Sequence, residues 1–245
     1  MSRVILVTGA NAGIGYELVK LLAEKGNKVY LGARNPKSGR EAAEKIAAEG
    51  FKDVHFIQID VTDLSTIEAT RDHIANADGH LDVLVNNAGI GELHRPQTAP
   101  TLDLAVLRTT TETNLFGLIQ TTTTLLPLIR KSSNGVILNV TSDMASNTIQ
   151  AKPNAIMNQA AAYNISKAAA NAYTIALARE LKDVEKTDIK VNTVTPGYTS
   201  TKLNGFGVGG KSVKAGAEIL LPWALLEKDG PTCLFIAASG KESAW

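Results

Sequence analysis

The sequence predicts an α/β fold in which a doubly wound parallel sheet carries helices on both faces. Six short apolar runs, rich in β-branched residues, alternate with amphipathic helical patterns, as they do in repeated βαβ units. Each run is continuously apolar, which is typical of strands that are buried on both faces. A chain of 245 residues is a size that such a fold routinely fills alone, so we expect one domain over residues 1–245.

The six runs and the segments between them set the order of the expected elements. The helical pattern Tyr16–Glu24 follows the first run, and comparable patterns follow the others. Residues 143–160, which are polar and contain Pro153, and residues 197–214, which are rich in glycine, interrupt this alternation. We expect both to be loops, the second flexible enough to be a lid over a substrate. The predicted strands are Val4–Val7, Lys28–Ala33, Val54–Ile59, Asp82–Val85, Val136–Val140 and Ile189–Val194.

The composition argues against several classes of partner. Lys and Arg total 25 and Asp and Glu total 24, so a net charge of +1 supplies no general field for nucleic acid or an anionic membrane. The lone Cys233 cannot form an internal disulfide, which suits a reducing compartment, and no apolar run is long enough for a signal peptide or a membrane span. We expect a cytoplasmic protein. The four histidines lack the spacing of metal ligands, so we expect no metal site.

A glycine-rich turn lies between the first strand and the first helix, where a dinucleotide would bind. Glycines permit the tight turn and let the backbone approach a pyrophosphate, and the following helix presents free N–H groups to it. An ordinary glycine-rich connection is the alternative interpretation, but the order strand, turn, helix favours binding. The residues that we assign to this site are Gly9, Asn11, Gly13, Ile14 and Gly15.

Arg34 follows the second strand, close to the point where an acidic residue would hold the ribose diol of NAD. No acidic residue stands there, and a guanidinium can form charge-assisted hydrogen bonds with the 2′-phosphate of NADP(H). The alternative is a solvent-exposed arginine at the start of the next helix. We therefore expect NADP(H) as the cofactor.

Tyr163 and Lys167 are four residues apart, so they share one face of a helix. A free tyrosine titrates with a pKa of ~10, and a fixed neighbouring cation lowers that pKa because it favours the phenolate. The pair therefore suits a tyrosine that exchanges a proton near neutral pH. This spacing also occurs often by accident, so its interpretation depends on the rest of the chain.

Six short motifs in order give the chain a resemblance to the short-chain dehydrogenases/reductases over nearly its whole length. The resemblance implies a single-domain Rossmann-type fold. The ending Asp229-Gly230-Pro231-Thr232, followed by Phe235 and Trp245, is similar to the carbonyl-reductase-like branch, although Cys233 stands where that branch often has glycine. The motifs are Thr8-Gly9-x3-Gly13-x-Gly15, Asn86-Asn87-Ala88-Gly89, Asn114, Ser142, Tyr163-x3-Lys167 and Pro196-Gly197.

The resemblance implies a role for each of four catalytic residues. Tyr163 would be the general acid in carbonyl reduction or the base in alcohol oxidation, and Lys167 would lower its pKa and bind the nicotinamide ribose. Ser142, at the end of a strand, would hydrogen-bond the substrate oxygen and orient it. Asn114 would hold a water that relays protons through Lys167; the alternative is a residue that kinks and hydrates a helix.

The resemblance also extends the cofactor site beyond the glycine turn and the arginine. Residues after the third and fourth strands would contact adenine and hold neighbouring strand ends together, and residues from Pro196 on would orient the nicotinamide carboxamide. The alternatives are local, with Asp60 as a helix cap and the threonines as turn residues. The residues concerned are Asp60, Val61, Asn86, Asn87, Tyr163, Lys167, Pro196, Gly197, Thr199 and Thr201.

Two departures from the family pattern concern the site. Ser142 and Tyr163 are 21 residues apart, a wider gap than is frequent in the family, which indicates an insertion in 143–160 beside the substrate. Ser146 thereby competes for the serine role, and we choose Ser142 because a strand end holds a side chain more rigidly than a loop does. Ala12 stands where many NADP(H)-dependent relatives carry a basic residue, so the cofactor preference rests mainly on the arginine after the second strand.

These features predict an NADPH-dependent reductase of small ketones or aldehydes, reversible in principle. Two other classes stay open: a regulator that binds NADP(H) without turnover, and an epimerase or dehydratase of nucleotide sugars. Intact Ser142, Tyr163 and Lys167 argue against the first, and 245 residues hardly accommodate the extra substrate domain of the second. The substrate, the direction of the reaction and the oligomeric state, a homo-oligomer included, are not visible in the sequence.

Overall fold

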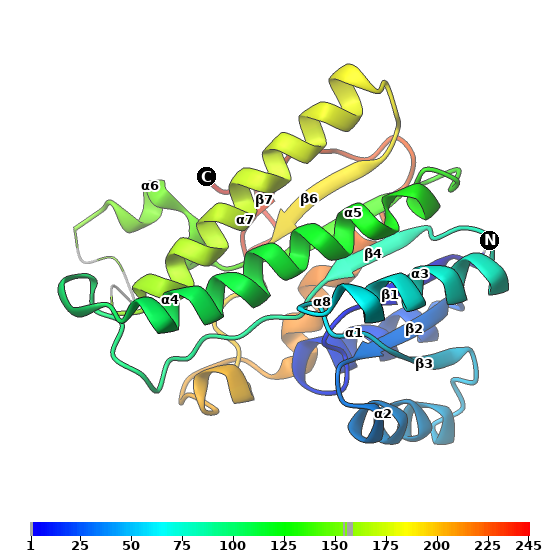
Figure 1. Ribbon diagram of the computed structural model, residues 1–245, viewed down its shortest axis with the longest axis horizontal. Helices are drawn as coiled ribbons and strands as arrows, with labels where there is room; N and C mark the ends of the chain where they lie inside the picture. The colour runs from blue at the N-terminus through cyan, green and yellow to red at the C-terminus, as the bar shows by residue number, and fades with distance from the viewer. Residues whose placement is uncertain (1, 154, 156–158) are drawn as a thin grey trace.

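The computed structural model describes residues 2–153, 155 and 159–245, and its centre is one parallel sheet. Within these residues seven strands are hydrogen-bonded in the order β3-β2-β1-β4-β5-β6-β7 (Figure 1). The chain moves outward from β1 to β3 and then outward from β4 to β7, so the direction of winding reverses between β1 and β4. The strands are β1 (Val4–Val7), β2 (Lys28–Ala33), β3 (Val54–Gln58), β4 (Val83–Asn86), β5 (Val136–Val140), β6 (Lys190–Val194) and β7 (Phe235–Ile236).

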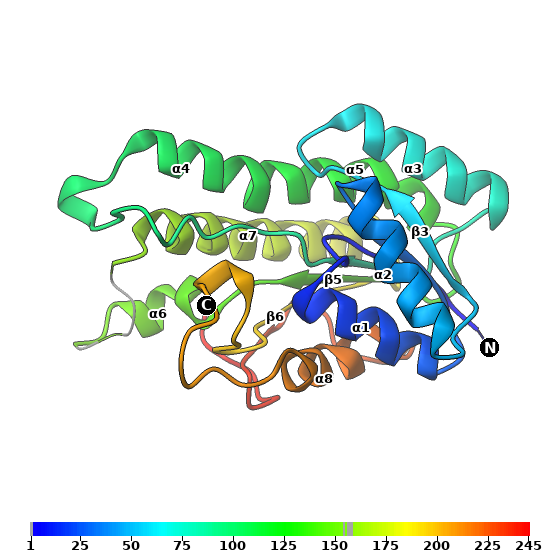
Figure 2. The same ribbon diagram turned by 90° about the horizontal axis from the view of Figure 1, so that it is seen from below.

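Helices cover both faces of the sheet, which lies edge-on between them in Figure 2. One face carries α1, α2 and α8, and the other carries α3, α5 and α7, with α4 packed on α7. Within the described part of the chain, no helix is long and apolar enough to cross a membrane. The helices are α1 (Gly13–Glu24), α2 (Pro36–Ala48), α3 (Leu64–Ala77), α4 (Leu104–Thr111), α5 (Gly117–Ile129), α6 (Asn147–Gln150), α7 (Ala161–Arg179) and α8 (Val213–Ala224).

Side chains that alternate along each strand separate two hydrophobic cores. On β1, Ile5 and Val7 join the core under α1, α2 and α8, whereas Val4 and Leu6 join the core under α3, α5 and α7. All four are buried, which is why the run reads as continuously apolar. The predicted doubly wound, Rossmann-type α/β fold is therefore confirmed.

The predicted strands match the observed ones, with shifts of one residue at the ends of β3, β4 and β6. The strand β7 is absent from the sequence prediction, because two residues are too few to show a period. It forms because Phe235 and Ile236 pair with Thr193 and Val194 of β6. This pairing is a long-range contact that the local pattern does not contain.

The segment 143–160 is not the purely irregular loop that its composition predicts. A 3₁₀ turn forms over Asp143–Ala145, and the one-turn helix α6 follows. The physical reason is capping, since the hydroxyl of Ser146 accepts a hydrogen bond from the backbone N–H of Ile149 at 3.1 Å. Residues 154 and 156–158 of the predicted loop lie outside the described residues.

The segment 197–214 also contains local structure. A 3₁₀ turn forms over Lys202–Asn204, and α8 already begins at Val213 because Ser212 caps it. Gly205 and Gly209, near the middle of this segment, adopt positive φ angles of 64° and 80°, a backbone conformation that favours glycine. The predicted lid is thus a structured turn that leads into a helix.

Two π-helical turns interrupt the helical layer formed by α4, α5 and α7. Glu112–Phe116 joins α4 to α5, and Glu180–Val184 extends the end of α7. A π turn inserts one extra residue into a helix and is frequent at functional sites. The first of these turns carries Asn114, one of the residues singled out in the sequence.

Candidate active site

The strand order places a crevice beyond the carboxyl ends of β1 and β4, where the direction of winding reverses. A cavity of about 880 Å³ occupies this position. That volume lies within the range of about 300–1,000 Å³ typical of small-molecule and cofactor sites. Most residues singled out in the sequence line it: Gly9, Asn11, Gly13, Ile14, Gly15, Arg34, Asp60, Val61, Asn87, Tyr163, Lys167, Pro196 and Thr201.

Other residues singled out in the sequence lie around the cavity without forming its wall. Asn86 is buried, and its side-chain nitrogen donates to Thr122 Oγ1 at 2.9 Å and to Asn139 Oδ1 at 2.8 Å. It ties β4 to α5 and β5, so a direct contact between Asn86 and a cofactor has no geometric support here. The Thr199 hydroxyl donates to the Gly197 carbonyl at 3.0 Å, which matches the turn alternative. The residues in this group are Asn86, Asn114, Ser142, Gly197 and Thr199.

The glycine turn leaves backbone donors open to the cavity. Gly9 and Gly13 have positive φ angles of 62° and 64°, which favour glycine. A Cβ atom on Gly15 would lie 2.5 Å from Asn87 Nδ2, so the close approach of α1 to β4 requires a glycine there. The N-cap of α1 is Ala12, which supplies no side-chain cap. The first N–H groups of α1 are therefore available to an anion.

Arg34 lies at the rim of the same cavity and is exposed. Within the described residues its guanidinium makes no ion pair or hydrogen bond, so it is available for a ligand. Asp60, which follows the neighbouring strand β3, accepts hydrogen bonds from the Thr62 backbone N–H at 3.0 Å and from the Thr62 hydroxyl at 2.8 Å. The N-cap of α3 is Asp63 instead, which removes the cap alternative for Asp60.

Tyr163, Ser142 and Lys167 converge where β5 ends and α7 begins. The Ser142 hydroxyl lies close enough to the Tyr163 phenol to lower its pKa. The Lys167 ammonium donates to the Val140 carbonyl at 2.9 Å and lies 5.9 Å from the centroid of the Tyr163 ring. Tyr163 and Lys167 are only 8% and 4% exposed. A proton donor, a second hydroxyl and a cation thus meet at the end of one strand.

Burial dominates the titration of this pair. It raises the pKa of Tyr163 to about 12, and the nearby Ser142 hydroxyl acts in the opposite direction. It lowers the pKa of Lys167 to about 8. The sequence led us to expect that Lys167 lowers the pKa of Tyr163. In the structure, burial of the phenol is the largest influence on the pKa of Tyr163, and it raises that pKa. Lys167 is not among the groups that lower it.

The structure distinguishes the two serines that compete for one role. Ser146 is fully buried, and its hydroxyl donates to the Ala244 carbonyl at 2.7 Å while it caps α6. The Ser146 hydroxyl is therefore used in hydrogen bonds that stabilise the local structure. Ser142 contacts Tyr163 and also accepts from the Met144 N–H at 3.2 Å. Ser142 is thus the serine whose hydroxyl lies beside Tyr163, and its catalytic role stays a prediction.

Asn114 is held tightly in the π turn between α4 and α5. Its side chain accepts from the Ile90 N–H at 2.9 Å and donates to the Ile90 carbonyl at 2.8 Å and to Ser166 Oγ at 3.0 Å. A Cβ atom on Gly89 would lie 3.1 Å from Asn114 Oδ1 and 3.3 Å from Lys167 Nζ. The missing side chain of Gly89 therefore keeps open a small space that faces both residues.

Several residues beyond those assigned from the sequence line the cavity. Glu92 and His94 line the cavity after β4, and Glu92 Oε2 lies 3.8 Å from His94 Nε2. Leu203 and Phe206 line it from the segment 197–214, and Phe206 is 68% exposed. Glu92 and His94 follow the end of a strand, where ligands of such sheets bind, and this position could have identified them from the sequence. Within the described part of the chain, no group of His, Cys, Asp and Glu residues is arranged to hold a metal ion.

Thr8 belongs to the first sequence motif, but the sequence assigns it no role of its own. Its contacts connect the two halves of the crevice. Its hydroxyl accepts from the backbone N–H groups of Asn87 and Ala88 at 3.1 and 3.0 Å. In return, Asn87 Nδ2 donates to the Thr8 carbonyl at 2.8 Å and the Gly9 carbonyl at 3.1 Å. These bonds fix the glycine turn at the end of β1 against the end of β4.

Comparisons with known proteins agree with this geometry. The family described as "short chain dehydrogenase" matches residues 3–207. Salutaridine reductase of Papaver bracteatum is 31% identical over 302 aligned positions, which cover 97% of this chain and 94% of that protein. Carbonyl reductase (NADPH) 1 of Bos taurus is 32% identical over 272 positions, which cover 96% and 95%. Both alignments exceed 245 positions, so each relative contains inserted segments that this chain lacks.

A solved structure shows the same architecture. The structure of salutaridine reductase from Papaver somniferum superposes on this chain with a TM-score of 0.80 at 30% sequence identity. The superposition covers 95% of this chain and 99% of that chain. The backbone architecture is therefore shared over nearly the whole length of both proteins.

We predict that Lys167→Met stabilises the protein without ligand at pH 7 and that this gain shrinks as the pH rises. The pKa of Lys167 in the folded state, about 8, lies below its ordinary value of 10.5, so the unfolded state binds more protons between these values. The cost of the buried charge is fully present below about pH 8 and is gone above about pH 10.5. It corresponds to roughly 3 kcal/mol, which the lost hydrogen bond to Val140 offsets by about 1 kcal/mol.

Urea unfolding of both proteins between pH 7 and pH 9.5 measures this difference. Lys45→Met, at an exposed position of α2, is the matched control and should show no such trend. A Lys167→Met protein that is less stable than the parent at pH 7, or a difference that is constant over this range, would contradict the prediction.

Proposed function

Because the chain belongs to the short-chain dehydrogenase/reductase family, we propose that it is an NADPH-dependent enzyme that reduces a ketone or aldehyde to an alcohol, reversibly. The observation that carries the proposal is the convergence of Ser142, Tyr163 and Lys167 where β5 ends and α7 begins, with Lys167 buried and bonded to the Val140 carbonyl. These groups lie at the edge of a cavity of a size that accommodates a cofactor. The family consists of NAD(P)(H)-dependent oxidoreductases, and the two relatives named above are reductases.

The residues that line the cavity fit a phosphorylated dinucleotide. The uncapped N-terminus of α1 and the glycine turn suit a pyrophosphate. The unpaired Arg34 suits the 2′-phosphate, and the name of the bovine relative includes NADPH. Lys167 and Tyr163 would hold the nicotinamide ribose, with Pro196 and Thr201 beside the nicotinamide. When bound, NADPH supplies the hydride that reduces the carbonyl carbon.

The chain's own residues orient the carbonyl and deliver the proton. The Ser142 hydroxyl would donate a hydrogen bond to the substrate oxygen and hold it beside the Tyr163 phenol. As negative charge develops on that oxygen, Tyr163 would transfer its proton there and become a phenolate. Lys167 would stabilise the phenolate and give it one of its own ammonium protons, and a water in the space that Gly89 leaves beside Asn114 would return a proton to Lys167.

The protonated state of Tyr163 suits carbonyl reduction at neutral pH. A pKa of about 12 keeps Tyr163 protonated at neutral pH, so the proton needed for reduction is in place before turnover begins. The alkoxide formed from the carbonyl is a stronger base than a phenolate and takes that proton readily. Alcohol oxidation would need the phenolate, which burial disfavours.

The surroundings of the site indicate a substrate with an apolar part. Leu93, Leu203 and Phe206 line the same cavity, and the last two belong to the segment expected to be a lid. We infer that this segment, 197–214, covers the substrate and that residues 1–245 act as one NADP(H)-binding unit in the cytoplasm. A regulator without turnover would not require the aligned hydroxyls of Ser142 and Tyr163.

A screen of NADPH oxidation across ketones, aldehydes and quinones tests the proposal, and we predict turnover with at least one class. Tyr163→Phe should lower that turnover by a factor on the order of 10³, because it removes the acidic proton and keeps the ring. NADPH affinity, measured by fluorescence, should stay within a few fold. Near-normal turnover by Tyr163→Phe would refute the mechanism. NADPH binding without oxidation of any compound would favour the regulator instead.

The two serines should respond differently to the same substitution. We predict that Ser142→Ala lowers kcat/KM by a factor of about 10²–10³, because the substrate oxygen loses its hydrogen-bond donor. Ser146→Ala should mainly lower stability, by about 1–2 kcal/mol, since it removes a helix cap and the bond to Ala244. Steady-state kinetics and thermal unfolding of both variants check this. The reverse pattern would transfer the catalytic role to Ser146.

We predict that Arg34→Ala weakens NADPH binding by about 1.5–3 kcal/mol, because a charge-assisted hydrogen bond to the 2′-phosphate is lost. NADH binding should hardly change, so the cofactor preference should narrow or invert. Arg40→Ala is the matched control, since that guanidinium lies over the Phe56 ring, 5.3 Å from its centroid. Equal losses for both cofactors in Arg34→Ala would show that Arg34 has a structural role.

A further inference from the structure

Gln97 lies between the wall of the candidate active site and the helix that carries Tyr163. It belongs to the segment that follows β4, and 66 positions separate it from Tyr163 in the sequence. It is buried, with only 1% of its surface exposed. A buried amide is costly unless its donors and acceptors are used, so the partners of Gln97 indicate what this residue does.

On one side, Gln97 caps the N-terminus of α7. The residue at the N-cap position, Ala160, forms no side-chain cap. Instead, the backbone carbonyl of Gln97 accepts a hydrogen bond from the Ala161 N–H at 3.0 Å, and its side-chain oxygen accepts one from the Tyr163 N–H at 3.3 Å. The first N–H groups of a helix have no intrahelical partners, and helix ends fray. A residue from a distant segment therefore fixes the first turn of α7, where Tyr163 lies.

On the other side, the same amide holds the wall of the cavity. Its nitrogen donates to the carbonyl of Gly91 at 2.8 Å and to the carbonyl of Glu92 at 2.9 Å. Both residues line the candidate active site. Glu92 has a φ angle of 49°, a left-handed conformation that few residues other than glycine adopt. Such a conformation persists only where its surroundings hold it, and the bond from Gln97 is one such restraint.

The wall that Gln97 holds also meets the segment 197–214. A Cβ atom added to Gly91 would lie 3.0 Å from Leu203 Cδ2, so Leu203 packs closely against this glycine. Leu203 and Gly91 line the same cavity as Tyr163. One buried amide therefore connects the wall beneath the segment expected to cover the substrate with the backbone of the expected proton donor.

The contacts of Gln97 define the way in which it can act. Both hydrogens of its amide nitrogen are used by backbone carbonyls, and Gln97 is not among the described residues that line the cavity. A carboxamide also has no proton to exchange near neutral pH. Gln97 can therefore influence a reaction only through the backbone groups that it holds, those of Gly91, Glu92 and the first turn of α7.

We propose that Gln97 is a positioning residue that fixes Tyr163 relative to the substrate wall, a role that rests on the reductase function proposed above. The carbonyl compound would touch the wall at Gly91 and Glu92 and take its proton from Tyr163, so the amide that joins them sets the geometry of proton transfer. A misplacement of about 1 Å can lower a rate by about 10²-fold. Gln97 forms no described hydrogen bond with the glycine turn or with Arg34, so NADPH affinity should depend on it little.

Gln97→Leu tests the proposal, because it keeps a similar volume and removes the three side-chain hydrogen bonds. With a carbonyl compound that the parent reduces, we expect kcat/KM to fall by a factor of about 10–100 and the Kd for NADPH to change by less than about threefold. Thr98→Val is the matched control and should behave like the parent, since the exposed Thr98 hydroxyl contacts only the Thr101 hydroxyl among the described residues. Parent-like kcat/KM in Gln97→Leu would overturn the proposal.

Gln97→Glu separates the two sides of this role and keeps the test decisive if Gln97→Leu fails to fold. Its carboxylate can still accept from the Tyr163 N–H but cannot donate to the carbonyls of Gly91 and Glu92. We expect KM for the carbonyl compound to rise several fold, with kcat closer to that of the parent than in Gln97→Leu. Circular dichroism checks that each variant is folded. Equal losses of kcat in both variants, with KM unchanged, would indicate a purely structural residue.

Hydrogen exchange separates a failure of this proposal from a failure of the proposed function. The Tyr163 amide, followed by NMR, should exchange faster in Gln97→Leu than in the parent or in Thr98→Val, because it loses its acceptor. Unchanged exchange would refute the role of Gln97 whether or not the parent turns over a substrate. If the parent consumes no NADPH with any carbonyl compound, the proposed function has failed, and exchange of this amide alone decides whether Gln97 positions Tyr163.

Discussion

The buried ammonium of Lys167 is the constraint on which the proposed catalytic half of the crevice depends. It donates to the carbonyl of Val140, at the end of β5, and so fixes the start of α7 against that strand. A charge that is 4% exposed and has no carboxylate partner is costly, so the surrounding structure must hold it in place. Ser166 donates to the Tyr163 carbonyl at 2.8 Å and accepts from Asn114 at 3.0 Å, so it ties the start of α7 to the π turn Glu112–Phe116.

The two halves of the crevice use different kinds of groups. The cofactor half is built largely of backbone, because the glycine turn and the first turn of α1 expose N–H donors. The catalytic half is built of side chains that are buried and hydrogen-bonded. The contacts between Thr8 and Asn87 join the halves across the ends of β1 and β4. A cofactor held by one half is thereby placed against the proton donor of the other.

Local sequence patterns predict the parts of this structure that depend on local physics. Continuously apolar runs predict the buried strands, and the spacing of Tyr163 and Lys167 predicts their common helix face. Asn86 is different, since its contacts with α5 and β5 come from residues far away in the chain. The same holds for Ser146, whose partner Ala244 is 98 residues distant. Burial also reverses the expected balance at Tyr163, and composition cannot show burial.

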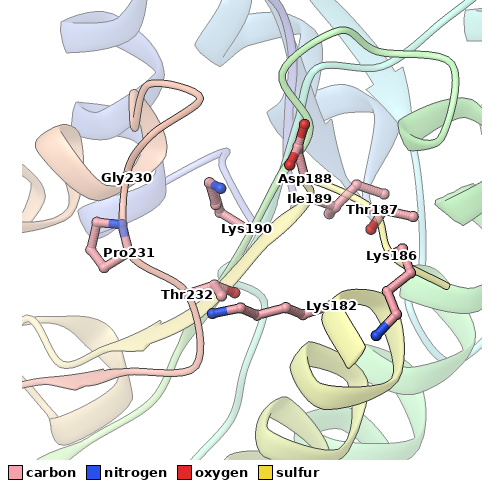
Figure 3. Close-up of a pocket in the computed structure, with 9 residues that line it drawn as sticks. All are labelled: Lys182, Lys186, Thr187, Asp188, Ile189, Lys190, Gly230, Pro231 and Thr232. Atoms are coloured by element: carbon pink, nitrogen blue, oxygen red, sulfur yellow. The ribbon is translucent and has the colours of Figure 1, made fainter. Parts of the chain in front are cut away.

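The lysines near the start of β6 show the same limit of local sequence patterns. Lys182, Lys186 and Lys190 are spaced four residues apart, a pattern typical of a solvated helix face. Helix α7 ends in the π turn Glu180–Val184, and Lys190 lies on β6 instead. The residues Gly230–Thr232, from a distant part of the chain, line the same hollow as the lysines (Figure 3). Only the folded chain brings these lysines around one cavity.

Isotope transfer tests most directly the claim that this site reduces a carbonyl compound with NADPH. The enzyme would be given NADPH with deuterium at both C4 positions and a carbonyl compound that it consumes, and the alcohol would be analysed by mass spectrometry and NMR. The account predicts one deuterium per molecule of alcohol, bonded to the former carbonyl carbon. Consumption of NADPH with no deuterium at that carbon would contradict it.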